Sequence, residues 1–529
     1  MLFKFTIFTV LNLYLFLFST KSFEFHNLQD MQQVEYSKSK LDSFIKNPKK
    51  ALWKMTLPFF LGLSVQSLYM LMDVMFVGKF LSRDGYNVCE LQQLSQSAID
   101  AMGVIFPLMF IIMGLTFGLG SGTTTLIAQY IGAKNKESAD SVASHTILIG
   151  ILLPAIIIAI VFLLGDSIIE VQLKNNTNPD TLKYAQEYFK IMALGSVFMV
   201  LAIFFRSILS GEGETVLPMK ILGFGTILNI ILDPIFIIVF KLEVAGAAIA
   251  TVISNGTVAL SFIYFLIIKK KSYTNISFKK DVFKFDFQII RSLFRLGIPA
   301  SASFAIMSIG MLANNSILSM ADYNTYGEVQ KYAEPGWAKD CPEIEKEGGV
   351  VGGYQISARI ENLFMNLVIA VSSSMVTIVG MFYGAGRPDL IRPVINYALK
   401  WGTIFSLIAT FIFFFFSNYI IHGFTNDPKT IDEAIKYFNI CAFTYPFVAI
   451  GMITCRAMQG MDKPTPFLFL TLLRVILIAI PMAWIGVKYF EYGTNWVWWS
   501  VLISSIVAAI FSLLWMYRII YYRERINLN

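Results

Sequence analysis

The sequence predicts an all-α polytopic membrane protein with twelve transmembrane helices in two six-helix lobes, related by a parallel internal repeat. Three observations predict this fold class. The 529 residues are 56% hydrophobic and only 15% charged, whereas soluble domains carry about a quarter charged residues. Long apolar segments alternate with short polar loops, which is typical of helical spans and not of a barrel. Motifs of the first half also recur in the second half in the same order.

Residues 1–46 are predicted to form an N-terminal extension, either a targeting segment or a peripheral one. Residues 2–18 are mostly apolar but short for a span, and they resemble the hydrophobic region of a signal peptide. Six lysines between Lys38 and Lys54 precede the first strong span. Such a basic cluster belongs on the cytoplasmic side, and cleavage of a signal would leave it outside.

Twelve apolar segments are long enough to cross the bilayer as helices. They are predicted at residues 51–80, 96–131, 141–166, 181–211, 214–240, 245–268, 289–320, 350–384, 394–422, 432–460, 464–488 and 495–521. The loops on the side of the N-terminus hold about twice as many Lys and Arg residues as the opposite loops, so both termini are expected in the cytoplasm.

The spans define the domain organisation that we expect. The N-terminal lobe covers residues 47–270, a basic cytoplasmic linker covers 271–288, and the C-terminal lobe covers 289–522. The insertion 322–349 is long, acidic and rich in Pro and Gly. It is expected outside the cytoplasm, either as an irregular lid or as a plain solvated insertion.

The two halves share motifs at matching places. Pro58 follows the opening of span one as Pro299 follows that of span seven, and Gly132 after span two corresponds to Gly384 after span eight. With six spans in each half, both repeats start on the same side of the membrane and are related by an axis along the membrane normal. A pathway between the two lobes follows from this arrangement.

The repeats differ in their acidic residues. Asp73 in span one corresponds to Asn314 in span seven, and the region of Asp233 corresponds to Ile480-Pro-Met-Ala483, which has no acid. Packing by itself would treat the two lobes alike. The difference therefore indicates that the chemistry lies in the first lobe.

Span five carries the first candidate site. Asn229 and Asp233 are four residues apart, so they share one face of a helix. A carboxylate near the bilayer centre costs about 3 kcal/mol or more, so such residues usually face a cavity and have a function. Pro234 removes a backbone donor and frees a carbonyl one turn back. Pairing of Asp233 with a neighbouring donor is the structural alternative.

Two further spans add oxygen atoms. Asp73 lies deep in span one, with Gln66 and Tyr69 on the same helix face, and Thr251 lies in span six. The oxygen-only set of Asp73, Asn229, Asp233 and Thr251 suits a hard cation such as Na+. The same two carboxylates, desolvated and close together, would instead hold a proton near neutral pH. A hydrogen-bonded helix seam at Asp73 and close packing at Thr251 are the structural alternatives.

Other charges within the spans have less certain partners. Glu361 in span eight is interpreted either as one member of an internal pair with Arg359 or as a contact within the second lobe. Arg474, about ten residues into span eleven, requires a partner that the sequence does not name.

The sequence contains no signature of an enzyme or of a bound cofactor. Three isolated histidines form no metal motif or triad: His26, His145 and His422. No phosphate-binding loop is present, so ATP is not the energy source. The net charge of +7 comes from basic residues in loops beside the membrane and does not indicate nucleic-acid binding.

The four cysteines have no metal-binding spacing. Cys441 and Cys455 lie in one apolar span and are expected to pack in the core. Cys89 and Cys341 fall in two loops expected on the same outer side, where a disulfide between them is one alternative.

Several of these stretches together resemble the multidrug and toxic compound extrusion family over residues 48–520. They are Leu52…Pro58, Gln66-Ser-Leu-Tyr-Met-Leu-Met-Asp73 with Gly78, Ser210-Gly-Glu-Gly213, Asn229-Ile-Ile-Leu-Asp-Pro234, Gly246-Ala-Ala-Ile-Ala-Thr251 and the Gly132-Ala and Gly384-Ala loops. The resemblance is to the branch whose ion site lies in the N-terminal lobe. The extension and the acidic insertion depart from the usual pattern.

The resemblance implies a twelve-helix exporter of amphipathic organic cations that is driven by entry of Na+ or H+. It implies that Asp73, Asn229, Asp233 and Thr251 bind the ion. It also implies that three residues contact the substrate: Gln66, Tyr69 and Tyr188. The other branch of the family keeps acids in spans seven and ten, and span seven here has none, so a second-lobe ion site is not expected.

We therefore expect a secondary antiporter that works by alternating access, as a monomer in the plasma or inner membrane, without a cofactor. Its partners would be small organic cations and the lipid bilayer. A lipid-linked-sugar flippase of related fold is the nearest alternative, and Arg474 argues weakly for it. A multispan membrane enzyme is a remote alternative because no catalytic set is present.

Overall fold

The computed structural model describes residues 40–80, 88–173, 179–278, 284–326, 350–423 and 428–526. These ranges contain helices, short turns and a linker, and no strand. Eleven of the described helical segments are long and apolar enough to cross a membrane. Each coincides with one of the expected spans, and the remaining span is α3, Pro48–Phe80. The predicted fold class is thus confirmed.

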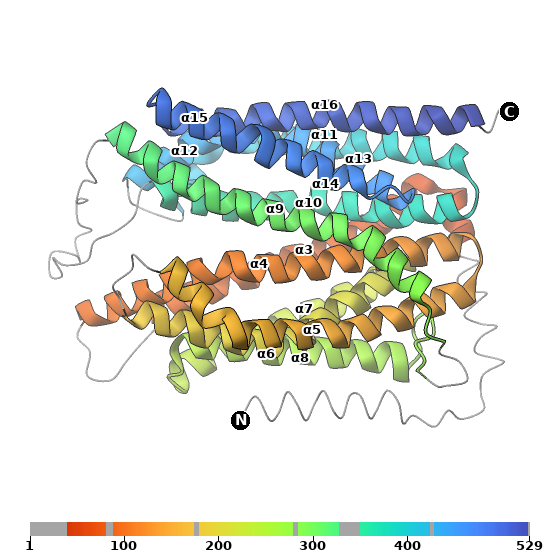
Figure 1. Cartoon of the computed structure of the whole chain (residues 1–529), viewed down its shortest axis with the longest axis horizontal. Coiled ribbons are helices and arrows are strands. Elements are labelled where there is room, and N and C mark those ends of the chain that lie inside the picture. The colour runs from red at the N-terminus through yellow and green to blue at the C-terminus, as the bar shows by residue number, and fades with distance from the viewer. Residues whose placement is uncertain are drawn as a thin grey trace. The chain divides into compact units, whose positions relative to one another are not determined.

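The chain divides into two compact units. The first unit comprises Met1–Ser301 with Gly380–Arg387, and the second comprises Ala302–Val379 with Pro388–Asn529. In each unit the long helices run roughly side by side along one direction (Figure 1). The domain boundaries expected from the sequence stay predictions.

The first unit is built around one central helix. Its helices are α3 (Pro48–Phe80), α4 (Val88–Gly132), α5 (Lys136–Gln172), α6 (Pro179–Gly211), α7 (Val216–Pro234) with the π-helical η1 (Ile235–Val239), and α8 (Glu243–Ile263) with the π-helical η2 (Tyr264–Ile268). Helix α6 packs against α4, α5 and α8 and is the most buried of the candidate spans. The π-helical turn after Pro234 agrees with the loosened backbone that this proline predicts.

The second unit contains the remaining helices. They are the larger part of α9 (Phe287–Tyr326) and of α10 (Val350–Gly384), then α11 (Pro388–His422), α12 (Pro428–Cys441), η4 (Ala442–Thr444), α13 (Tyr445–Gly460), α14 (Thr465–Leu472), the π-helical η5 (Leu473–Ala479), α15 (Ile480–Tyr489) and α16 (Thr494–Ile526). Helix α13 packs against α11 and α16. Cys441 and Cys455 are buried and free, as expected of packing residues; Cys341 and the side chain of Cys89 lie outside the described residues.

The internal repeat is visible in how helices end. Helix α4 ends with Lys134 at φ 58°, and α10 ends with Gly386 at φ 65°. In both turns the next residue donates a backbone hydrogen bond five residues back, from Asn135 to Tyr130 and from Arg387 to Phe382, at 2.9 Å in each case. This closure is the left-handed helix cap.

Close contacts between small residues fasten the ends of α9 and α10 to α4. A Cβ atom on Gly118 of α4 would lie 2.1 Å from Ser301 Oγ, and one on Gly384 of α10 would lie 1.9 Å from the Gln129 carbonyl oxygen. The Ser301 hydroxyl also donates to the Leu115 carbonyl at 3.0 Å. These backbones approach too closely to admit a side chain, which explains why residues 287–301 and 380–387 belong to the first unit.

The connection after η2 is also fixed to the first unit. The Glu212 carboxylate accepts hydrogen bonds from the Ser272 and Thr274 hydroxyls, at 2.6 Å each, and from the backbone N–H groups of residues 273 and 274. The Asn275 backbone N–H donates to Asp140 Oδ1 at 2.8 Å. Residues 272–275 are therefore a packed strap and not a free tether.

Residues 40–46, the described end of the N-terminal extension, are helical. Lys40 Nζ forms an ion pair with Glu214 Oε2 at 2.9 Å, and a Cβ atom on Gly213 would lie 3.1 Å from the Phe44 ring. This short helix is therefore held against the turn between α6 and α7.

Candidate functional site

A buried polar pair lies in the last turn of α7. Asn229 and Asp233 are 2% and 0% exposed, and Asn229 Nδ2 donates to Asp233 Oδ1 at 3.1 Å. The four-residue spacing places both side chains on one helix face, as the sequence predicts. The donor bond turns the amide oxygen of Asn229 away from Asp233. That oxygen has no hydrogen-bond partner among the described residues.

Three buried hydroxyl groups on neighbouring helices share this lack of partners. They belong to Thr251 and Ser254 of α8 and to Ser196 of α6, and none has a hydrogen-bond partner in the described part of the chain. A buried hydroxyl without a partner costs about 1–3 kcal/mol, so several of them in one region indicate a polar ligand. Ser254 follows Thr251 by three residues on the same helix face, a signal that the sequence analysis did not use.

Glycine contacts fix the level of Thr251 relative to α7. A Cβ on Gly225 would lie 2.2 Å from Val258 Cγ2, and a Cβ on Gly246 would lie 2.9 Å from the Phe236 carbonyl carbon. Helices α7 and α8 therefore run in opposite directions. Because each residue advances a helix by about 1.5 Å, interpolation between the two contacts places Thr251 level with the turn that carries Asn229 and Asp233.

A similar argument places Ser196. A Cβ on Gly195 would lie 2.2 Å from Val252 Cγ2, and one on Gly256 would lie 3.7 Å from Phe198. Helices α6 and α8 therefore run in the same direction, and Ser196 is level with Ser254. Only the packing of α6 on α8 brings this hydroxyl to the level of Ser254, so no pattern in the sequence identifies it.

The backbone of Asp73 lies at the same level. Helix α3 packs beside α7, where a Cβ on Gly62 would lie 3.7 Å from Met219 Cα. Successive helices of the first unit alternate in direction, so α3 and α7 run the same way. Asp73 is eleven residues beyond Gly62 and therefore level with Ile230, eleven residues beyond Met219. The side chains of Asp73 and Tyr69 lie outside those that the structure describes.

The two described residues that the resemblance assigns to substrate lie away from this level. Gln66 and Tyr188 are both partly buried. Gln66 precedes Asp73 by two turns of α3, and Tyr188 precedes Ser196 by about two turns of α6, roughly 10 Å along each helix axis. The height along the helix axes at which Asn229, Asp233 and Thr251 lie is called the polar level here. Because α3 and α6 run in opposite directions, Gln66 lies on one side of this level and Tyr188 on the other, so the two are not brought together.

Comparison with known proteins decides the family. The family model MatE matches residues 88–235 and 349–485, which together make up more than half of the chain and include one stretch from each half. The chain belongs to the multidrug and toxic compound extrusion family. The family relation implied by the sequence motifs is thus confirmed.

Full-length relatives agree with the family match. The probable multidrug resistance protein NorM of Thermotoga maritima is 24% identical over 492 residues, which cover 90% of this chain and 96% of that protein. The FAD transporter of Shewanella oneidensis is 27% identical over 444 residues, covering 83% of this chain and 88% of that protein.

Solved structures of the family have the same fold. One is a MOP superfamily transporter of Pyrococcus furiosus, reported to have a binding pocket of reverse polarity. It is 27% identical with a TM-score of 0.78, and the match covers 90% of this chain and 96% of that chain. A MATE in complex with MaL6 has a TM-score of 0.79 at 27% identity, covering 90% and 97%.

Membership of the family confirms the predicted function as a secondary active, multi-pass membrane transporter. The family and these relatives are transporters, which speaks against an enzyme and does not favour the lipid-linked-sugar flippase.

In this transporter the second unit also contains partly buried charges, Glu361 and Arg474. The Tyr437 hydroxyl donates to Glu361 Oε2, and Glu361 interacts electrostatically with Arg474. Arg359 is exposed. Of the two interpretations of Glu361, the structure supports a contact within the second unit. Glu361 is also the opposite charge that acts electrostatically on Arg474, without an ion pair between them. These partners come from α10, α12 and η5, so helix periodicity could not have found them.

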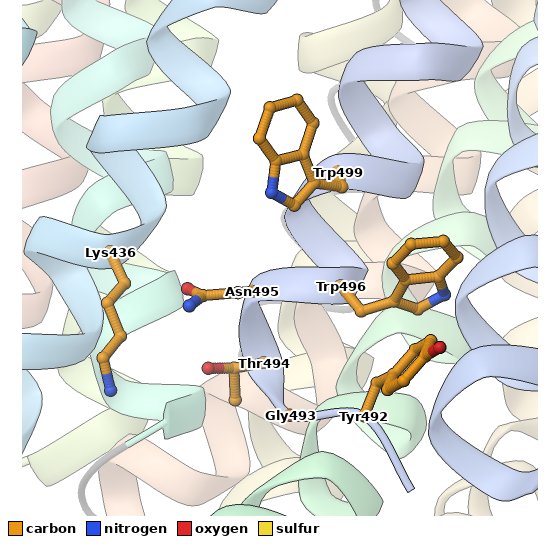
Figure 2. Close-up of a pocket in the computed structure, with 7 residues that line it drawn as sticks. All are labelled: Lys436, Tyr492, Gly493, Thr494, Asn495, Trp496 and Trp499. Carbon is orange, nitrogen blue, oxygen red and sulfur yellow. The ribbon is translucent and has the colours of Figure 1, made fainter. Parts of the chain in front are cut away.

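A pocket of about 350 Å³ also lies in the second unit, at the start of α16. Figure 2 shows Lys436 of α12 across from Thr494 and Asn495, with Trp496 and Trp499 on the α16 side. The Lys436 amine is held by Asp432 and Glu433 at 2.7 Å each. Aromatic side chains and a lysine at a helix end are typical of the membrane–water interface. This pocket is not part of the polar level in the first unit.

Proposed function

We propose that this transporter couples export of an organic compound to entry of Na+ or H+, and that the ion binds in the first unit at Asp73, Asn229, Asp233 and Thr251. The observation that carries the proposal is the buried Asn229–Asp233 pair, with hydroxyl groups at a similar level on nearby helices that lack hydrogen-bond partners among the described residues. Ser196 and Ser254 add hydroxyls near the same level.

The chemistry of these groups suits a small cation. All the candidate ligands are oxygen atoms from carboxylate, amide and hydroxyl groups, the donors that hard cations prefer. If these residues only joined helices, their hydroxyl groups would be expected to hydrogen-bond within the protein, because an unsatisfied buried hydroxyl destabilises the fold. The same carboxylates can take up a proton, so the experiment below tests Na+ and H+ separately as the coupling ion.

The ion site links charge to conformation. When the carboxylates face outward they gain an ion, which removes net negative charge from the space between α3, α7 and α8 and weakens their hold on a cationic substrate. When they face inward they release the ion to the side where it is scarcer. One proton crossing one pH unit contributes about 1.4 kcal/mol, and one charge crossing 100 mV contributes about 2.3 kcal/mol. These amounts suffice to concentrate a solute roughly tenfold or more per coupled ion.

For the substrate we propose amphipathic, cationic organic compounds, with Gln66, Tyr69 and Tyr188 as contacts. The names of the relatives support a small-molecule substrate, since one is a probable multidrug resistance protein and another an FAD transporter. The placement of Gln66 and Tyr188 on either side of the polar level fits an elongated molecule rather than a compact one.

For the topology we propose that both termini are cytoplasmic and that the protein is a monomer in the plasma or inner membrane. The distribution of Lys and Arg residues among the loops supports this orientation. Residues 322–349 then lie outside, and the strap at 272–275 lies in the cytoplasm.

The test is transport by the purified protein in lipid vesicles. Efflux of a fluorescent organic cation is followed under an imposed Na+ gradient at constant pH and, separately, under a pH gradient without Na+. We expect efflux under one of the two gradients, and we expect Asp73→Asn and Asp233→Asn each to lower it at least about tenfold while the protein still folds.

Asp166→Asn is the matched control. Asp166 lies in α5 of the same unit, is 46% exposed and pairs with Lys190 at 2.7 Å. Its substitution removes the same charge outside the proposed site, so efflux should be unchanged. Normal coupled efflux by both Asp73→Asn and Asp233→Asn would show that the proposed ion site is wrong.

A further inference from the structure

A second polar cluster lies inside the second unit, where the sequence led us to expect no ion site. Its centre is Glu361 of α10, which accepts the hydrogen bond of the Tyr437 hydroxyl through Oε2. The other carboxylate oxygen has no hydrogen bond from a described residue. Glu361 therefore keeps one oxygen available for a ligand.

Arg474 of η5 is the opposite charge that acts on this carboxylate. The two groups interact electrostatically, yet no ion pair within 4.0 Å joins them, and none of the Arg474 N–H groups has a hydrogen-bond acceptor among the described residues. Arg474 lies in the π-helical η5, a type of segment that often marks a functional site. Both side chains are partly buried, and a pair held for structure alone would gain most from direct contact, which offsets the desolvation of its charges.

Two buried donors beside the cluster are also unsatisfied. Tyr445 and Trp498 are each 1% exposed, and neither the Tyr445 hydroxyl nor Trp498 Nε1 has a hydrogen-bond partner in the described part of the chain. Tyr445 lies within electrostatic range of Glu361, and the Trp498 ring lies 4.9 Å from the Tyr437 ring. Buried tyrosine and tryptophan donors are usually paired, so these two indicate an acceptor that the described residues do not supply.

The walls of the cluster are aromatic. The Tyr354 ring stacks on Trp498 with centroids 5.6 Å apart, and it lies 5.9 Å from the Tyr437 ring. Aromatic walls with a few converging polar groups are the usual construction of a site for a small organic molecule. The adjacent residues Lys436 and Trp499 line the pocket of Figure 2, so α12 and α16 contribute to both features.

We infer that this cluster binds a dipolar organic substrate, with its cationic nitrogen at Glu361 and its anionic group at Arg474. A small cation by itself would leave Arg474 unmatched, and a small anion would leave Glu361 unmatched. A molecule that carries both charges satisfies both groups, which are not joined by an ion pair of their own. The inference rests on the proposed export of organic compounds and adds, in the second unit, a separate binding position for molecules that carry both charges.

The experiment compares two probes that share one ring system. Rhodamine B carries a cationic xanthylium and a free carboxylate, whereas its ethyl ester keeps the cation and lacks the anion. Binding of each to the purified full-length protein is measured by fluorescence anisotropy. We expect the free acid to bind about tenfold more tightly than the ester, since a charge-assisted hydrogen bond to Arg474 is worth about that factor.

Variants assign the preference to its residues. Arg474→Met should abolish the preference for the acid, by weakening binding of the acid and not of the ester. Arg474→Lys should keep part of the preference, and Glu361→Gln should weaken binding of both probes. Arg456→Met is the matched control in the same unit, because Arg456 bonds Gln459 at 2.8 Å and stacks on the Phe467 ring. That control should keep the wild-type ratio.

Two results would overturn the inference: a wild-type protein that binds the ester as tightly as the acid, and an Arg474→Met variant that retains the ratio. Arg474→Lys covers the case in which Arg474→Met does not fold. These outcomes are separate from the proposed ion coupling, which fails only if Asp73→Asn and Asp233→Asn leave gradient-driven efflux intact.

Discussion

Replacing Thr251 by valine tests whether this residue binds the ion or only packs between helices. Thr251 is 6% exposed, and its hydroxyl has no hydrogen-bond partner among the described residues. Valine keeps the branched shape and removes the unsatisfied hydroxyl. We therefore expect Thr251→Val to raise the free energy of unfolding in the absence of the coupling ion by up to about 1 kcal/mol.

The same change should weaken the response to the ion. An ion present at 100 times its Kd stabilises the folded protein by about 2.7 kcal/mol. Loss of one oxygen ligand weakens binding about tenfold, which leaves about 1.4 kcal/mol at the same concentration. Thr251→Val is thus expected to have a higher free energy of unfolding without the ion and a smaller increase of that free energy when the ion is added. A residue that only packs would not produce these two opposite changes.

The assay is thermal unfolding of the detergent-solubilised protein, titrated with Na+ at fixed pH and with pH in the absence of Na+. Thr123→Val is the matched control, because the Thr123 hydroxyl is buried and bonds Thr146 Oγ1 at 3.0 Å and the Leu119 carbonyl at 3.3 Å. It should lower stability by about 1–2 kcal/mol and leave the ion response intact. A Thr251→Val variant that behaves like this control would refute Thr251 as a ligand.

Two other predictions concern stability. Gly118→Ala should destabilise the first unit by several kcal/mol in the same thermal assay, because its Cβ would lie 2.3 Å from the Ser301 backbone nitrogen. Gly223→Ala is the control: nothing lies within 4 Å of its Cβ, so this variant should be neutral or slightly more stable. Burial raises the pKa of Glu214, but Lys40 and two backbone N–H groups outweigh it and leave that pKa below its ordinary value. The Lys40–Glu214 pair therefore stabilises the docking of residues 40–46 above the ordinary carboxyl pKa, and this contribution, below about 1 kcal/mol, is lost as the pH falls through the lowered pKa. Protection of residues 40–46 against hydrogen exchange, corrected for the intrinsic pH dependence of exchange, should fall by up to about fivefold at acidic pH in the wild type. In Glu214→Gln it should be lowered by a similar factor near neutral pH and lose this pH dependence; equal protection in both proteins near neutral pH would contradict the role of the pair.

The second unit shows what the sequence could not predict. Glu361 follows Arg359 by two residues, a spacing that does not bring side chains together on a helix, and its actual partners lie on α12 and η5. The missed hydroxyl of Ser196 is a similar case, since it reaches the polar level only through the packing of α6 on α8. Contacts between helices depend on how each helix is rotated about its axis, and the hydropathy of a lipid-facing span constrains that rotation weakly.

By itself, the sequence determined the number of spans, their repeat and the helix face that Asn229 and Asp233 share. It did so because hydrophobic length sets a span and a four-residue spacing sets one helix face. The tertiary structure decided which helices lie at the level of that pair and which charges meet in the second unit. Close contacts at glycines such as Gly225 and Gly246 fix that register, and such contacts are defined only when two helices pack together.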